Sequence, residues 1–224
     1  HITQLSDGNL AVSYGGGGDG SGFGIFLKIV QPDGAVITSP IAVNTTTAGD
    51  QVFSQIATHA DGQFVVAWHD NTADSNIHAQ IFQNSGAPVG GEFLLNTTTT
   101  GTQIAHGLIN LPGGGFFAAW QSNTLPDGSA ADSWALLGRQ FDAAGQPVGA
   151  EIVIEHAFNP SQGAFPEMTI LADGSIFVAY SGQFTGDSDP SLAIAGRVIS
   201  LSSSVGSIDA GAGDDRIFIQ NLSG

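Results

Sequence analysis

The chain has 224 residues, of which 42% are hydrophobic, so it is long enough to bury the core of one large domain or two small ones. Acidic side chains outnumber basic ones by 20 to 4, and the formal net charge of −16 at pH 7 argues against binding to nucleic acid or to anionic membrane surfaces. Cysteine is absent, which excludes disulfide bonds, and no apolar run approaches the ~20 residues that a membrane-inserted helix needs.

One pattern occurs four times along the chain, and each time it predicts a β-hairpin. The copies read LSDGNLAVSY, HADGQFVVAW, LPGGGFFAAW and LADGSIFVAY. Their turns open at Asp7, Asp61, Gly113 and Asp173, at intervals of 54, 52 and 60 residues, and an aromatic residue always stands seven positions later. Asp-Gly between two apolar runs favours a two-residue turn with positive φ at both central residues.

Two further strands are expected after each hairpin. The third carries a long polar side chain in one register, which either lines a channel or bonds blade carbonyls: Lys28, Gln80, Arg139 and Arg197. The fourth is clear in PIAVNTTT, EFLLNTTT and EIVIEHA, and residues 216–221 are expected to supply it in the last copy.

Four antiparallel strands in each 50 to 60 residues are typical of a β-propeller blade. Tandem β-sandwiches and a β-solenoid are the alternative all-β layouts. We therefore predict an all-β fold, a propeller of four antiparallel four-stranded blades or part of a larger propeller, with blades at about 1–50, 51–103, 104–162 and 163–224.

Three segments of the repeats and one glycine-rich stretch carry a family resemblance. The segments are GGEFLLNTTTTGTQ, LPGGGFFAAWQSN and GRQFDAAGQPVGAE, and residues 210–218 match the nonapeptide G-G-x-G-x-D-x-U-x except that alanine replaces the first glycine. In these features the chain resembles secreted bacterial proteins of the RTX (repeats-in-toxin) group. The resemblance divides it into a propeller-like domain, 1–206, and an RTX-like glycine-rich turn with a final strand, 207–224. It implies calcium as a cofactor, type I secretion and an extracellular or cell-surface location.

Candidate calcium ligands lie in the RTX-like turn and in the acidic loops that follow the aromatic residues. Calcium prefers six to eight oxygen ligands, so a single turn supplies only part of a site. We expect Asp215 to belong to such an unfinished site, whereas the loop carboxylates either bind calcium or are simply solvated. The predicted metal-binding residues are Asp209, Gly211, Gly213, Asp215, Asp187, Asp189, Asp70 and Asp74.

The aromatic residues that end the second strands have two interpretations. They stack on sugar rings, or they pack each blade against the next, which their repetition favours. Trp134 has no counterpart in the other copies and is expected in the longest loop, which makes it the preferred ligand contact. The predicted ligand-binding residues are Trp134, Trp68, Trp120, Tyr14 and Tyr180.

Signals for catalysis are sparse in this sequence. The motif G-x-S-x-G and a phosphate-binding P-loop are absent, and three of the four glutamates lie beside strand ends, where they indicate structural roles.

The histidines lack zinc-binding spacing and are expected at the surface. The Asn-Thr-Thr sequences at Asn44 and Asn96 predict turns in which the side chains bond the local backbone.

These features together predict a secreted, non-catalytic module that binds a glycan or a protein at a cell surface, within a calcium-dependent RTX-like protein. Two alternatives remain open. One is an enzyme domain that acts on polysaccharide, since carboxylate pairs hydrolyse glycosidic bonds. The other is a purely structural module of a surface layer or spacer.

Overall fold

The computed structural model describes residues 1–59, 62–160, 165–184, 193–201 and 208–209. Within these residues all regular structure is β-strand, as the sequence predicted. The same residues contain no helix that is long and apolar enough to cross a membrane.

The first half of the chain forms two separate antiparallel sheets of four strands each, here called units 1 and 2. Unit 1 consists of β1 (Ile2–Gln4), β2 (Leu10–Gly17), β3 (Phe23–Val30) and β4 (Ile41–Ala42). Unit 2 consists of β5 (Asp50–Thr58), β6 (Gln63–Asn71), β7 (Ile77–Gln83) and β8 (Pro88–Leu94). In each unit the strands pair in chain order, so consecutive hairpins build the whole sheet.

The second half repeats this plan, but its two units are joined into one sheet. Unit 3 consists of β9 (Gln103–Asn110), β10 (Phe116–Thr124), β11 (Ala130–Phe141) and β12 (Pro147–Pro160). Unit 4 consists of β13 (Glu167–Ile170), β14 (Ile176–Phe184), β15 (Ala193–Leu201) and β16 (Ile208–Asp209). The end of β12 pairs with the end of β14, where Phe158 lies opposite Phe184, so the two units form a continuous eight-stranded sheet.

The hairpin turns at the three repeated sites that the structure describes in full, near Asp7, Gly113 and Asp173, differ from the predicted type. In the first turn the Gly8 N–H donates to the Leu5 carbonyl, and the Asp7 carboxylate accepts a hydrogen bond from the Asn9 N–H. Only the glycine has a positive φ, of 88°, whereas the predicted two-residue turn needs two such residues. This is the longer hairpin connection in which a type I turn is followed by a left-handed glycine.

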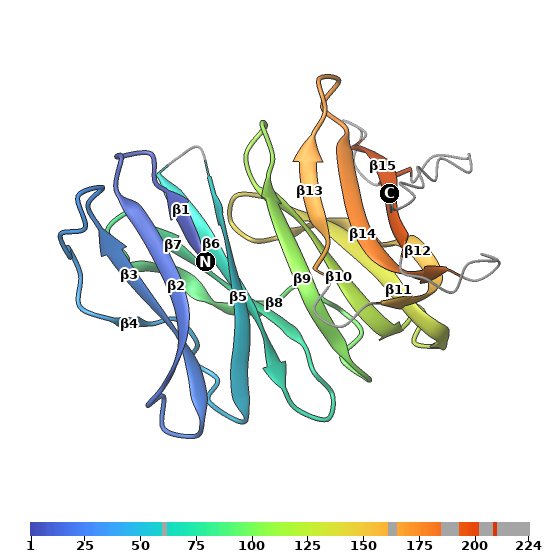
Figure 1. Cartoon of the computed structure of the whole chain (residues 1–224), viewed down its shortest axis with the longest axis horizontal. Coiled ribbons are helices and arrows are strands. Elements are labelled where there is room, and N and C mark those ends of the chain that lie inside the picture. Colours follow the sequence, from blue (N-terminus) through green and yellow to red (C-terminus); the bar gives the residue numbers. More distant parts are fainter. Residues whose placement is uncertain (60–61, 161–164, 185–192, 202–207, 210–224) are drawn as a thin grey trace, which may run out of the picture.

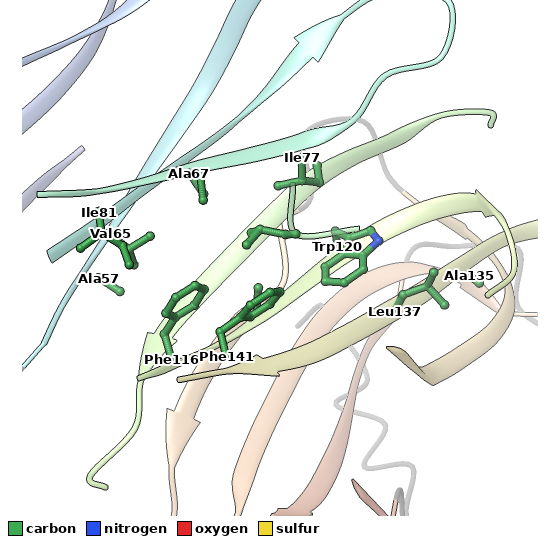
Figure 2. Close-up of a cluster of buried hydrophobic side chains, with 13 residues drawn as sticks. Ala57, Val65, Ala67, Ile77, Ile81, Phe116, Trp120, Ala135, Leu137 and Phe141 are labelled. Atoms are coloured by element: carbon green, nitrogen blue, oxygen red, sulfur yellow. The ribbon is translucent and has the colours of Figure 1, made fainter. Parts of the chain in front are cut away.

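The four units stand side by side (Figure 1), and buried apolar side chains form a cluster between each pair of neighbours. Figure 2 shows the cluster between units 2 and 3, where Trp120 and Phe116 lie against Val65 and Ile77. Trp68 occupies the same place between units 1 and 2, and Tyr180 between units 3 and 4. The core of this protein therefore lies between sheets, because a single four-stranded sheet buries too little apolar surface to be stable alone.

Carboxylates from one unit also tie down the corner of the preceding unit. Glu92 of β8 accepts hydrogen bonds of 2.7 Å from both the N–H and the hydroxyl of Thr45. Glu151 of β12 accepts the same two bonds from Thr97. Within each corner the amide of Asn44 or Asn96 bonds the local backbone, which confirms the predicted Asn/Thr turns.

The arrangement of the units resembles consecutive propeller blades, but they do not form a ring. In the described part of the chain, unit 1 and unit 4 lie at opposite ends of the row (Figure 1). The predicted four-bladed ring is thus absent, although its blade-like sheets are present. The sequence repeats predict the sheets, whereas closure depends on the angle between them.

We expect Trp120→Ala to lower the free energy of unfolding by about 3–5 kcal/mol, because it removes a fully buried ring and leaves a cavity between two sheets. Tyr14→Ala, at the equivalent position of unit 1, is the matched control. Tyr14 is only half-buried, so its loss is expected to cost about 1 kcal/mol or less. Urea denaturation measures both values, and equal losses would contradict the assigned packing role.

Candidate functional site

The aromatic residues predicted to bind a ligand are mostly packing residues in the structure. Trp68 and Trp120 are 0% exposed and Tyr180 is 3% exposed. Each lies in a cluster between two units, so no ring face is available to a sugar. Of the two interpretations drawn from the sequence, the burial matches packing and not ligand binding.

The two other predicted aromatic contacts lie in different surroundings. Trp134 belongs to strand β11 and is half-buried against the cluster between units 3 and 4, so it does not lie in a long loop. The expected loop is a hairpin whose two strands extend to Thr124 and from Ala130. Tyr14 lies on the outer face of unit 1, 6.0 Å from the ring of Phe26 between centroids.

The register of long polar side chains also has mainly a structural role. Gln80 donates to the carbonyls of Ile81 and Val89, and Arg139 donates to the carbonyl of Gly149. Arg197 reaches Glu155 of the preceding unit at 3.2 Å. The bonds of Gln80 and Arg139 match the predicted contact with blade carbonyls, whereas Arg197 pairs with a carboxylate, which the sequence did not predict.

The predicted calcium ligands fall into two groups. Gly211, Gly213, Asp215, Asp187 and Asp189 lie outside the described residues, as does the side chain of Asp209 at the end of β16. Asp70 and Asp74 are described, and hydrogen bonds within the protein engage both. Asp74 accepts from the Gly101 N–H at 2.8 Å, and no group of three metal-binding side chains occurs among the described residues. Calcium binding stays a prediction.

Asp70 takes part in a buried chain of charged groups within unit 2. His78 of β7 donates from Nε2 to Asp70 at 3.1 Å and from Nδ1 to Glu92 at 2.8 Å. Asp70 also accepts from the Asn76 N–H and the Thr72 hydroxyl. The ring of His78 stacks on Trp68, with 5.8 Å between centroids. Because Glu92 also accepts a hydrogen bond from Thr45, this network of charged groups connects the interior of unit 2 to the corner of unit 1.

The contacts of His78 decide its charge. Burial works to lower the pKa of His78, but the hydrogen bonds and charges of Asp70 and Glu92 outweigh burial and raise that pKa to about 9. Burial works to raise the pKa of Glu92, yet the bonds from His78 and Thr45 lower it to about 2. The pKa of Asp70 is also lowered, since its hydrogen bonds outweigh burial. His78 is therefore a cation at neutral pH.

A second cluster, here called the inner aromatic cluster, brings together Phe53, His69, His106 and Phe165. Phe53 of β5 stacks on His69 of β6 with 5.3 Å between centroids, and lies 5.5 Å from Phe165. His106 of β9 meets His69 edge to face at 5.9 Å. The cluster thus joins units 2, 3 and 4 beside their first strands, which lie next to one another.

Phe53 is the exposed member of this cluster and has an unusual backbone. Its side chain is 60% exposed, and its φ is 55°. A positive φ is rare for a bulky residue, and such strain is typical of functional sites. The equivalent residue in unit 3, Ala105, has a φ of 48°, so a bulge in the first strand is part of the repeat and turns the ring of Phe53 outward.

The two histidines beneath Phe53 are buried and uncharged at neutral pH. Burial lowers the pKa of His69 to about 4, against the charge of Asp70. Burial and the charge of His69 lower the pKa of His106 to about 3. The prediction of surface histidines holds for His1 and His156, which are exposed, but was wrong for the four that are buried: His59, His69, His78 and His106. Within the described residues His69 Nδ1 has no hydrogen-bond partner.

One glutamate remains available for chemistry near this cluster. Glu92 and Glu151 bind the unit corners, and Glu155 binds Tyr180 and Arg197, as the prediction of structural glutamates stated. Glu167 is exposed, lies two residues beyond Phe165, and begins the first strand of unit 4. Among the described residues its carboxylate has no hydrogen-bond or ion-pair partner. The sequence alone does not distinguish Glu167 from the other three glutamates, and only the contacts in the structure do so.

Comparison with solved structures shows that the fold of this chain also occurs in carbohydrate-active enzymes. An endo-arabinase from Bacteroides thetaiotaomicron superposes with a TM-score of 0.54 and 15% identity, over 91% of this chain and 75% of the arabinase. A levansucrase variant from B. subtilis gives a TM-score of 0.53 and 9% identity, over 98% of this chain and 68% of the levansucrase. A polysaccharide lyase that acts on ulvan gives a TM-score of 0.53 and 9% identity, over 91% of this chain and 55% of the lyase.

No protein-family model matches the sequence, and no curated protein is significantly similar to it. At these identities the structural similarity establishes a likeness of fold alone: the all-β, blade-like sheets of this chain superpose on those of β-propeller enzymes, although its described sheets do not close into a ring. The RTX resemblance finds no counterpart in the comparisons and stays a prediction. The prediction of a non-catalytic binding module was wrong, because the similar structures are enzymes such as an endo-arabinase and a levansucrase, and they favour the enzyme alternative.

The buried charged network of Asp70, His78 and Glu92 predicts that the stability of the protein depends on pH. The folded-state pKa of His78, about 9, lies above its ordinary value of 6.5, so its contribution is complete below pH 6.5 and is lost as the pH rises through 9. We expect wild type to exceed His78→Gln in unfolding free energy by on the order of 2 kcal/mol at pH 6.5, and this difference to vanish above pH 9. Urea denaturation across this range tests it. A constant difference would show that His78 is not the titrating group.

Proposed function

We propose that the chain forms the substrate-binding and catalytic part of an enzyme that acts on polysaccharides. The inner aromatic cluster carries the proposal, because it keeps the ring of Phe53 exposed at the cost of an unfavourable φ. The apolar face of a sugar ring stacks on such an aromatic surface. The shared fold with an endo-arabinase and a levansucrase supports this assignment. Secretion, an extracellular location and calcium, which the RTX resemblance implies, remain proposals beside it.

The charges of the described residues favour an uncharged polysaccharide. Each described cationic side chain already has its own contacts: Lys28 lies over Tyr14, Arg139 over Phe141, Arg197 beside Glu155, and protonated His78 between Asp70 and Glu92. His69 and His106 are neutral at pH 7 because burial lowers their pKa values. A uronate or sulfate group at Phe53 would therefore meet no described cation, and the net charge of −16 would repel it.

Glu167 is the proposed acid or base in this site. Cleavage of a glycosidic bond needs a carboxyl group that protonates the leaving oxygen, or one that activates water. Glu167 follows Phe165, whose ring contacts Phe53, and its carboxylate has no hydrogen-bond or ion-pair partner among the described residues. A sugar stacked on Phe53 would bring its glycosidic bonds to the side of the cluster where Glu167 begins its strand.

The first test is turnover of neutral polysaccharides. We expect the purified chain to release reducing ends from at least one member of a panel of arabinan, levan, galactan and xylan, and Glu167→Gln to lower kcat at least about 100-fold, as loss of a general acid does. Asp33→Asn is the control, since Asp33 is an exposed carboxylate that caps a turn in unit 1. Full activity in Glu167→Gln would remove this residue from the mechanism, and absence of turnover on every polysaccharide would remove the function.

The second test separates the ring of Phe53 from its backbone. Phe53→Gly removes the ring and also relieves the positive φ, so we expect weaker binding of the substrate oligosaccharide without loss of stability. Ala105→Gly is a matched control, because it relieves the same backbone strain in unit 3 without removing a ring. Calorimetric titration measures affinity and thermal denaturation measures stability. Unchanged affinity in Phe53→Gly would exclude Phe53 as the stacking surface.

A further inference from the structure

The outer face of unit 1 has no neighbouring sheet in the described structure. On β2 and β3, Ala11, Ile25 and Leu27 belong to the cluster with unit 2. Side chains alternate along a strand, so the intervening residues face the other way. This outer face consists of Ile2, Leu10, Val12, Tyr14, Phe26, Lys28 and Val30.

The equivalent face of every other unit is buried against the preceding unit. At the positions of Leu10, Val12 and Tyr14, unit 2 has Phe64, Val66 and Trp68, unit 3 has Phe116, Ala118 and Trp120, and unit 4 has Ile176, Val178 and Tyr180. All nine of these residues are buried between two units. In unit 1 the three counterparts are half-buried, and Ile2 is 60% exposed. The apolar pattern is thus retained where nothing in the described structure covers it.

A pair of polar groups shows what the covering element needs. In unit 4, Tyr180 and Arg197 stand on neighbouring strands, where Arg197 lies opposite Val178. Both reach Glu155 in the second half of β12 in unit 3, the Tyr180 hydroxyl at 2.7 Å and the Arg197 guanidinium at 3.2 Å. This carboxylate of the preceding unit accepts from both groups in the buried interface.

Unit 1 repeats the same pair in the same register. Lys28 lies opposite Val12, as Arg197 lies opposite Val178, and its ammonium stands 5.8 Å from the centroid of the Tyr14 ring. Among the described residues the Tyr14 hydroxyl has no hydrogen-bond partner, and Lys28 has no carboxylate partner. Units 2 and 3 carry tryptophan at the position of the tyrosine, so only units 1 and 4 combine a phenol with a cation.

We propose that the outer face of unit 1 is a docking surface for a further blade of the same repeat, whose fourth strand carries a carboxylate at the position of Glu155. That carboxylate accepts hydrogen bonds from Tyr14 and Lys28, as Glu155 does from Tyr180 and Arg197. The apolar face of the blade covers Leu10 and Val12. A second copy of this chain does not fit this role with its own third unit, because its Glu155 is already engaged by Tyr180 and Arg197.

The test supplies such a blade to the full chain. A second copy of residues 103–166 is placed directly before His1, because His1 occupies the repeat position of Glu167 and the junction then keeps the native register. The chain has two tyrosines, so nitration by tetranitromethane, followed by mass spectrometry, reports on Tyr14 and Tyr180 separately. We expect nitration of Tyr14 to slow to the rate of Tyr180. Glu155→Ala in the added copy alone should restore part of the Tyr14 reactivity.

Nitration of Tyr14 at the rate found in the unextended chain would overturn the proposal. A second comparison, in the unextended chain, holds even if the extended chain does not fold. Val12→Asp is expected to leave the melting temperature close to wild type, because the outer face is open, whereas Val178→Asp at the equivalent position of unit 4 is expected to unfold the interface. An equally large loss from Val12→Asp would show that this face is already covered within the chain, and would also overturn the proposal.

Discussion

The fold depends on one contact that recurs along the chain. In it, an aromatic side chain on the second strand of one sheet packs against the apolar face of the preceding sheet. Trp68, Trp120 and Tyr180 each make this contact. A four-stranded sheet alone exposes two faces to water and gains too little from burial to offset the loss of chain entropy. The sheets therefore stabilise one another in sequence, and each unit is only as stable as its contact with its neighbours.

Hydrogen bonds at the corners between units fix the positions of the sheets that the apolar packing brings together. Apolar surfaces tolerate small displacements, whereas a carboxylate that accepts two bonds from one threonine fixes a position. Glu92 and Glu151 do this at successive corners, and His78 holds Glu92 from the interior of unit 2. The charged network at His78 thus has a structural explanation, because the buried His78 cation keeps the carboxylate of Glu92 ionised and oriented.

The sequence predicted the features that repeat and missed those that do not. Turn residues and aromatic residues at a constant spacing identified the hairpins, the sheets and the packing role of the tryptophans. The join between β12 and β14 was not predictable, because it comes from strands that extend past their blade, without a compositional signal. The buried histidines were missed because they do not recur, since the other copies carry different residues at each of their positions. His78, for example, replaces Phe26 and Leu137.

The candidate site was hidden from the sequence for a related reason. Phe53 and Phe165 are more than 100 residues apart in the chain, and only the packing of first strands brings their rings together. The bulge that exposes Phe53 depends on a positive φ at a residue type that gives no hint of it. The carboxylates that sequence motifs would select, in the acidic loops, are engaged by backbone and side-chain partners in the described residues.

The join between β12 and β14 has a mechanical consequence. Backbone hydrogen bonds join units 3 and 4 into one sheet, whereas units 2 and 3 are held mainly by side-chain packing, by the corner carboxylate of Glu151 and by a bond from the Gln103 N–H to the Ser75 carbonyl. Packed sheets slide over one another more readily than paired strands separate, so relative motion concentrates at the packed boundaries, between units 1 and 2 and between units 2 and 3. Phe53 and His69 lie on one side of the boundary between units 2 and 3, and His106 and Phe165 lie on the other. The spacing of the rings in the inner aromatic cluster therefore depends on packing between sheets and not on strand pairing.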